Sequence, residues 1–202
     1  MTAMSTASSL YGLQDYVRDL EQVLDRRPAL PVIVREASTA MKRLLASDRW
    51  LEDRCRQTCP DNYARHLLHR DRHNRFVVLA LTWLPGQATP VHDHSCWGLM
   101  GLLENALEEV HYERLDDGSR ADRAELRQGR TGTCAQGGVA WLLPPYEEIH
   151  RIGCVGSRPA ISIHVYGRDL DAVNVFDPVT GRVSPMRIKY YSTECGKTPF
   201  VI

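Results

Sequence analysis

Two histidines separated by a single residue, His92 and His94, are the side chains of this 202-residue chain best suited to chemistry. Side chains two apart on an extended strand point to the same face, so both imidazoles could bind one metal ion. A His-x-His sequence also occurs by chance. The prediction of a metal site therefore depends on the sequence around it.

The surrounding glycines and proline strengthen this prediction. Gly86, five further residues and His92 form the pattern G-x5-H-x-H, which resembles the first half of the metal motif of the cupins. The second half is a glycine, five residues, a proline and a histidine, and Gly138, Pro144 and His150 resemble it with one extra residue before the histidine. In cupins the two halves face each other across a small jelly-roll barrel. The resemblance thus implies that all three histidines bind one ion.

The glutamate that usually follows the second histidine of this motif is absent. Gly98 and Leu99 occupy its positions, and Glu104 and Glu108 come too late in the predicted strand to replace it easily. Three neutral imidazoles suit iron or zinc and leave up to three positions open on an octahedral ion. Such a site keeps the full charge of the ion for an anionic ligand such as a thiolate.

The elements that must position these residues change character along the chain. Apolar residues recur three and four apart in residues 13–24 and 32–45, which predicts two helices. Short apolar segments between Gly, Pro and Asp turns then predict strands at residues 75–84, 97–103, 107–114, 138–143 and 160–166.

This order of elements predicts a mostly β fold, a cupin jelly-roll barrel preceded by two or three N-terminal helices. We expect one domain, with a helical segment at residues 1–60 packed on a barrel at residues 61–202. The tail from residue 177 contains three prolines, so we expect it to be irregular.

Composition limits the partners that we expect. The chain has 25 basic and 25 acidic residues, which argues against nucleic acid or a membrane surface as the main partner. Its apolar segments are shorter than the roughly 20 residues that span a bilayer, and its start lacks the order of a secretion signal. We therefore expect a cytoplasmic monomer or small homo-oligomer that acts on small molecules.

Four short sequences, in the right order, resemble motifs of the thiol dioxygenases, the cysteine dioxygenase family. They are Tyr63-Ala64-Arg65-His66-Leu67, His92-Asp93-His94, His150-Arg151 and Ser162-Ile163-His164-Val165-Tyr166. The resemblance covers residues 63 to 166. It implies an enzyme that binds Fe(II) through His92, His94 and His150 and uses O₂ to oxidise a small carboxylate-bearing thiol to a sulfinic acid.

The resemblance also implies roles for residues around the ion. Tyr166 would hydrogen-bond the substrate or the oxygen, and Ser162 and His164 share its strand face and could relay that bond. Arg65 would pair with the substrate carboxylate, and Tyr63 could add a hydroxyl. The alternative for Ser162, His164 and Tyr166 is a set of inward-facing polar side chains that hydrogen-bond only one another. The alternative for Arg65 is a surface arginine.

The identity of the substrate depends on the arginine. In the family, arginine at the position of Arg65 goes with cysteine, whereas many bacterial members that prefer 3-mercaptopropionate have glutamine. We expect L-cysteine first, with 3-mercaptopropionate or mercaptosuccinate as alternatives. Animal members link their active-site tyrosine to a cysteine; Gly98 falls near that position, so we expect Tyr166 to have no crosslink, with Cys96 on a different part of the turn.

Two other classes of protein remain as alternatives. Another metallo-cupin enzyme would not need Arg65 or Tyr166 and would usually keep the motif glutamate. A non-catalytic ligand-binding cupin would commonly lose metal ligands. The remaining histidines (His66, His69, His73 and His111) we interpret as surface or core residues.

Overall fold

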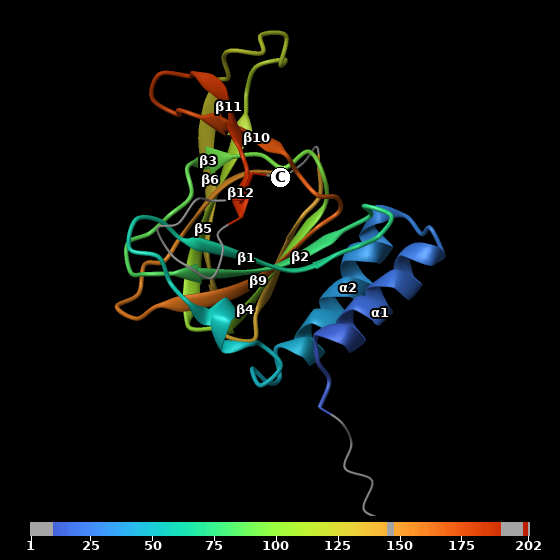
Figure 1. Cartoon of the computed structure of the whole chain (residues 1–202). Coiled ribbons are helices and arrows are strands. Elements are labelled where there is room, and N and C mark those ends of the chain that lie inside the picture. Colours follow the sequence, from blue (N-terminus) through green and yellow to red (C-terminus); the bar gives the residue numbers. More distant parts are fainter. Residues whose placement is uncertain (1–9, 145–147, 191–199, 202) are drawn as a thin grey trace, which may run out of the picture.

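The computed structural model describes residues 10–144, 148–190 and 200–201. Two helices, α1 (Leu13–Asp25) and α2 (Leu30–Leu44), precede the strands and lie together on one side of them (Figure 1). A short 3₁₀ helix, η1 (Asp53–Arg56), follows. The prediction of a mostly β cupin-type fold preceded by two or three helices is confirmed.

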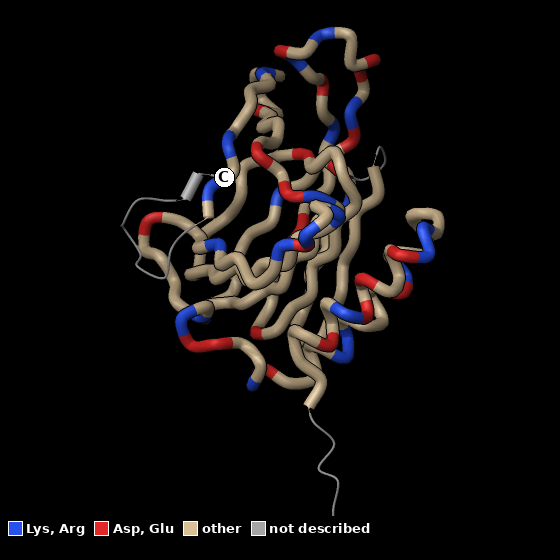
Figure 2. Tube along the Cα trace, turned by 45° about the vertical axis from the view of Figure 1, so that its right-hand side comes forward, with Lys and Arg blue, Asp and Glu red and all other residues tan. Residues whose placement is uncertain are grey.

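Each helix forms where the apolar spacing predicts it. The apolar faces of α1 and α2 are buried, and Asp15 accepts a hydrogen bond from the Gly12 backbone N–H at 3.0 Å where α1 begins. Pro31 lies in the first turn of α2, where its missing N–H has no helical partner to lose. Acidic and basic residues are interspersed along both helices (Figure 2). None of the described helices is long and apolar enough to cross a membrane.

The strands form two antiparallel sheets. In the first, the hydrogen-bonded order is β1 (Ala64–Arg70), β2 (Val77–Trp83), β9 (Ala160–Tyr166), β4 (Gly98–Glu104) and β7 (Val139–Leu142). In the second, it is β11 (Val183–Arg187), β10 (Ala172–Phe176), β3 (Val91–His92), β8 (Ile149–Gly153), β5 (Ala106–Arg114) and β6 (Leu126–Ala135). A further pair joins β12 (Lys189–Tyr190) to β13 (Phe200–Val201). Neighbours such as β2 and β9 are far apart in sequence, as in a jelly roll.

The five-stranded sheet is buried on both faces. Its outer face packs on the helices, and Gly101 of β4 lies so close to α2 that a Cβ there would be 2.8 Å from Met41 Cγ. Its inner face forms a second core around Leu79, Leu102 and Trp83. Because both faces are covered there, β2 and β9 are buried at every position; β2 is apolar at nearly every position, whereas β9 carries Ser162, His164 and Tyr166 on its inner face.

The expectation of an irregular tail from residue 177 is wrong for the part that the structure describes. Strand β11 pairs with β10, and the connecting turn contains Gly181 at φ 70°, in the left-handed region that glycine adopts easily. Pro178 lies in that turn and Pro185 on the edge strand β11, where a missing N–H is tolerated. Residues 191–199, with the third proline, lie outside the described residues.

One close approach gives a test of this packing. A Cβ at Gly167, directly after β9, would overlap the indole of Trp97. We expect Gly167→Ala to lower the free energy of unfolding by about 1–3 kcal/mol, because the rigid ring has to move. Gly132→Ala on the exposed strand β6, where a Cβ would meet nothing within 4 Å, should change it by no more than about 0.5 kcal/mol. Chemical denaturation measures both; equal effects would contradict the packing.

Candidate functional site

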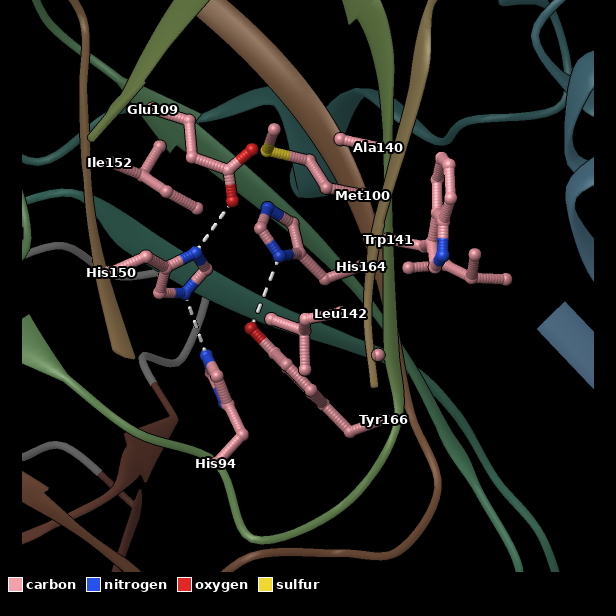
Figure 3. Close-up of a pocket in the computed structure, with 12 residues that line it drawn as sticks. His94, Met100, Glu109, Ala140, Trp141, Leu142, His150, Ile152, His164 and Tyr166 are labelled. Atoms are coloured by element: carbon pink, nitrogen blue, oxygen red, sulfur yellow. Dashed lines mark hydrogen bonds and ion pairs between the residues drawn. The ribbon is translucent and has the colours of Figure 1, made fainter. Parts of the chain in front are cut away.

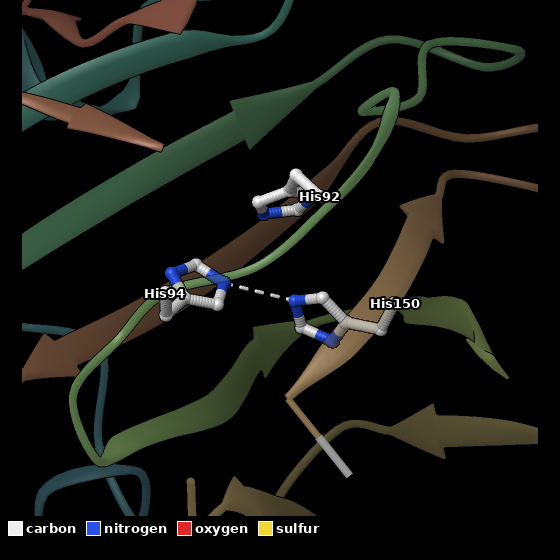
Figure 4. A group of neighbouring side chains, drawn as sticks. All are labelled: His92, His94 and His150. Atoms are coloured by element: carbon white, nitrogen blue, oxygen red, sulfur yellow. Dashed lines mark hydrogen bonds between the residues drawn. The ribbon is translucent and has the colours of Figure 1, made fainter. Parts of the chain in front are cut away.

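Three buried histidines meet in the space between the sheets (Figure 4). His92 of β3 lies opposite His150 of β8 in the antiparallel register, and His94 follows β3 by two residues. One nitrogen from each ring lies within 4.8 Å of the other two. His94 Nε2 and His150 Nε2 are 2.9 Å apart. The structure therefore brings together the three histidines of the two motif halves found in the sequence.

The reason for their convergence differs from the one expected. Strand β3 ends at His92, so alternation along a strand does not align His94 with it. Asp93 instead accepts hydrogen bonds from the Asn174 backbone N–H at 2.9 Å and from its side-chain amide at 2.8 Å. Ser95 has a φ of 49°. The contacts between Asp93 and Asn174 hold the segment between His92 and His94, and the His94 ring lies edge-on to the other two.

Hydrogen bonds on the outer nitrogens orient two of the rings. His92 Nδ1 lies 3.0 Å from the Pro90 carbonyl oxygen and His150 Nδ1 lies 2.6 Å from Glu109 Oε1. A carbonyl and a carboxylate only accept, so each Nδ1 carries the proton and each Nε2 has a free lone pair. His94 Nδ1 is buried and has no hydrogen-bond partner among the described residues.

The site holds His92 and His94 neutral. Burial, followed by the charges of neighbouring groups, lowers the pKa of His92 to about 3 and the pKa of His94 well below its usual value. Burial alone would raise the pKa of Glu109, but hydrogen bonds from His111 and His150 outweigh it and hold that pKa below its usual range. At neutral pH His92 and His94 are therefore uncharged, and a carboxylate lies beside the third histidine.

These residues fit a transition-metal ion. Imidazole nitrogen is a preferred donor for iron and zinc. Two nitrogens each about 2.0–2.1 Å from one ion, at a right angle, would be about 2.9 Å apart, the separation of His94 and His150. His94 and His150 are therefore spaced to bind one ion, and His92, whose ligand nitrogen lies within 4.8 Å of theirs, could complete the site.

A chain of hydrogen bonds reaches the same space from β9. Trp83 Nε1 donates to Ser162 Oγ at 2.9 Å, Ser162 Oγ lies 2.9 Å from His164 Nε2, and His164 Nδ1 lies 3.1 Å from the Tyr166 hydroxyl. Indole only donates, so Ser162 accepts from Trp83 and its own proton is available for His164 Nε2; with His164 protonated on Nδ1, His164 donates in turn to the Tyr166 oxygen. Burial raises the pKa of Tyr166, so the phenol retains its hydrogen. That hydrogen remains free to point toward the histidines.

Figure 3 shows that the side chains of His94, His150, His164 and Tyr166 lie close together around one pocket. The pocket is lined by His94, Gly98, Leu99, Met100, Glu109, Ala140, Trp141, Leu142, His150, Ile152, His164 and Tyr166. The ring of Tyr166 stacks on that of His94, with centroids 4.8 Å apart. Gly98 lies opposite Tyr166 in the β4–β9 register, and a Cβ on it would be 3.4 Å from Tyr166 Cδ1.

The predicted substrate residues lie beside this pocket, outside its lining. Arg65 of β1 is half-buried, and its positive charge contributes to lowering the pKa of both His92 and His164. Its guanidinium carbon is 5.6 Å from the centroid of the Tyr190 ring, and its Nε is buried without a hydrogen-bond partner among the described residues. The Tyr63 ring stacks on Trp83, with centroids 4.5 Å apart.

Sequence reasoning missed several residues of the site. Glu109 faces the histidines because it alternates with the buried Leu107 on β5, and this alternation was the available signal. His111, interpreted as a surface or core residue, lies with Nε2 3.4 Å from Glu109 Oε2. Trp83 and Tyr190 carried no local signal, because their roles depend on tertiary neighbours.

Comparisons with known proteins agree on one family. The family model described as "Cysteine dioxygenase type I" matches residues 13–179. The cysteine dioxygenase type 1 of Rattus norvegicus is 26% identical over 142 residues, 68% of this chain and 67% of that protein. The cysteine dioxygenase type 1 of Danio rerio is 23% identical over the same shares of the two chains.

Two solved structures are also similar. The protein TT1209 from Thermus thermophilus is 21% identical, with a TM-score of 0.42 over 58% of this chain and 96% of that one. A conserved protein with a double-stranded β-helix domain from Klebsiella pneumoniae is 16% identical, with a TM-score of 0.43 over 70% of this chain and 100% of that one.

The buried histidines make a prediction about acid stability. Burial lowers the pKa of His164 to about 3, whereas in the unfolded chain it is about 6.5. Below pH 6.5 the unfolded chain takes up a proton that the folded chain refuses, so stability falls as pH falls from 7 toward 3. In the metal-free protein, His164→Phe should reduce the loss of stability between pH 7 and pH 5 by about 2 kcal/mol.

Denaturation at the two pH values measures this difference. The control is His73→Gln, at an exposed position, which should leave the loss as in the unsubstituted chain. A loss in His164→Phe equal to that of the control would mean that His164 is not held neutral.

Proposed function

The chain belongs to the cysteine dioxygenase type I family, and we propose that it is a non-haem Fe(II) thiol dioxygenase that oxidises a small carboxylate-bearing thiol with O₂ to the sulfinic acid. The observation that carries the proposal is the meeting of three buried imidazoles with a hydrogen-bond chain that ends at the Tyr166 hydroxyl. The overall change is balanced, because both atoms of O₂ are added to the sulfur of the thiol.

His92, His94 and His150 are the residues that would hold the ferrous ion. When bound, the ion supplies a centre at which a thiolate and O₂ are brought together and the spin barrier to their reaction is removed. The residues of the chain supply the surroundings. All three rings are buried, so water is largely excluded and electrostatic interactions at the site are strengthened.

Tyr166 is the proposed hydrogen-bond donor to the reacting groups. His164 and Ser162 hold its oxygen from one side, which leaves the phenol hydrogen for a substrate or oxygen atom. The chain begins at Trp83, whose indole N–H donates to Ser162 and leaves the Ser162 proton available for His164.

Arg65 is the proposed anchor for the carboxylate of the substrate, with Tyr63 beside it. No carboxylate among the described residues pairs with Arg65, although its Nε is buried. A half-buried guanidinium without an acidic partner favours a carboxylate ligand, which it can bind through two parallel hydrogen bonds. L-Cysteine remains the first choice of substrate, and 3-mercaptopropionate and mercaptosuccinate are the alternatives.

Oxygen consumption tests the proposed function. The Fe(II)-loaded protein is assayed with L-cysteine, 3-mercaptopropionate, mercaptosuccinate and cysteamine. We expect uptake with at least one carboxylate thiol and less with cysteamine, which lacks the carboxylate. The variant His92→Ala should bind no iron and consume no O₂. No uptake with any thiol, at verified iron occupancy, would favour another metallo-cupin enzyme instead.

The role of Arg65 is tested by substitution. Arg65→Ala should raise KM for the preferred carboxylate thiol roughly 10- to 150-fold, the equivalent of about 1.5–3 kcal/mol for a charge-assisted pair. Arg65→Lys keeps the charge but loses the two parallel hydrogen bonds, so its KM should lie between those of the unsubstituted protein and Arg65→Ala. Arg127→Ala, at an exposed position on β6, is the control. An unchanged KM in Arg65→Ala would remove this residue from substrate binding.

A further inference from the structure

We propose that Glu109 is a positioning residue of the metal site, and that its carboxylate holds His150 with the proton on Nδ1 and the lone pair of Nε2 facing the ion. The inference rests on the proposed metal role of the three histidines. It concerns a residue outside every motif that identifies the family in this sequence.

The geometry is direct. Strand β5 pairs with β8 so that His111 lies opposite His150 and Glu109 lies opposite Ile152. From there the Glu109 side chain reaches His150, with Oε1 2.6 Å from Nδ1 (Figure 3). Its other oxygen, Oε2, is 3.4 Å from His111 Nε2. The carboxylate is thus held between two imidazoles, and only one of these faces the metal site.

The three candidate ligands differ in what lies behind them. His92 has a neutral backbone carbonyl behind it, and His94 Nδ1 has no partner among the described residues. Among the described residues, a carboxylate contacts the outer nitrogen of His150 but not that of His92 or His94. A carboxylate that accepts from the outer N–H of a ligand imidazole fixes its tautomer and increases its basicity. His150 is therefore the strongest donor of the three.

This arrangement places the negative charge of Glu109 behind a candidate ligand, close to the ion but not in direct contact with it. The glutamate that other cupins use as a direct ligand is replaced here by Gly98 or Leu99, which leaves three histidines as the candidate ligands. Glu109 keeps a carboxylate close by without occupying a position on the ion. All open positions stay available to substrate and O₂, while part of the charge of the ion is offset through His150.

The outer side of Glu109 faces a hollow that helps to keep it charged. A surface hollow of about 340 Å³ between β6 and β7 is lined by Glu109 together with His111, Cys134 and Trp141. A carboxylate with one oxygen against a ligand and access to polar surroundings on the other side costs less to bury than one that is fully enclosed. The Glu109 side chain therefore lies in the wall of the barrel, between the metal site and this hollow.

Metal affinity tests the inference without any assay of turnover. Co(II) binding to the metal-free protein is measured by competition with a chelator. Glu109→Gln keeps the size of the side chain and removes its charge, and we expect it to weaken Co(II) binding about 10- to 100-fold. Glu108→Gln is the matched control, since it makes the same change at the next residue of β5, on the opposite face of the strand. Affinity in Glu109→Gln equal to that of the control would overturn the proposal.

A second variant separates this inference from the proposed function. His92→Ala should abolish Co(II) binding. If it binds Co(II) like the unsubstituted protein, the three-histidine metal site itself is wrong. If His92→Ala loses binding while Glu109→Gln keeps it, the metal site stands and the role of Glu109 falls.

A measurement on the unsubstituted chain guards against a variant that fails to fold. Nitrogen NMR of the ¹⁵N-histidine-labelled, metal-free protein reports which ring nitrogen of His150 carries the proton. We expect Nδ1 to be protonated and Nε2 to be free of a covalent proton. The opposite tautomer would overturn the proposal, because an Nδ1 without a proton could not donate to the Glu109 carboxylate.

Discussion

The burial of three imidazoles around one point is the constraint on which the rest of this structure depends. Each ring must lose water, and each outer nitrogen then needs a partner or remains unsatisfied. Pro90 and Glu109 provide those partners for His92 and His150, and they also fix which nitrogen faces inward. Because His94 Nε2 and His150 Nε2 are already 2.9 Å apart, the site is arranged for an ion before one binds.

The architecture follows from the need to hold this point rigidly. Strand β3 contributes only two residues, yet it lies between β10 and β8, so His92 is fixed from both sides. On the opposite sheet, β9 lies between β2 and β4 and presents Ser162, His164 and Tyr166 from one face. The helices cover the outer face of that sheet, which keeps β9 buried and its polar side chains facing inward. The two sheets thus bring a metal site and a directed hydrogen-bond chain to the same pocket.

Much of the site could be predicted from the sequence because it is encoded locally. The spacing of Ser162, His164 and Tyr166 has the period of a strand, and the structure places them on one. The three histidines are grouped correctly, although the described strand ends at His92 and His94 lies two residues beyond it. Alternation with Leu107 could place Glu109 on the inner face of β5, but only the pairing of β5 with β8 shows that its carboxylate reaches His150.

The edges of the fold were harder to predict for a similar reason. Strand β6 is exposed along nearly its whole length, so it lacks the alternating apolar pattern that identifies a half-buried strand. Strand β11 contains Pro185, which argues against a central strand but is compatible with the edge that it occupies. Tertiary pairing, which the local sequence does not record, decides both cases.

The most direct test of the account is the fate of the oxygen atoms. The Fe(II)-loaded protein is given its preferred carboxylate thiol under ¹⁸O₂, and the product is analysed by mass spectrometry. The account predicts a sulfinic acid in which both sulfinate oxygens carry the label. A disulfide with hydrogen peroxide, or a product with one labelled oxygen or none, would contradict a dioxygenase built on these three histidines.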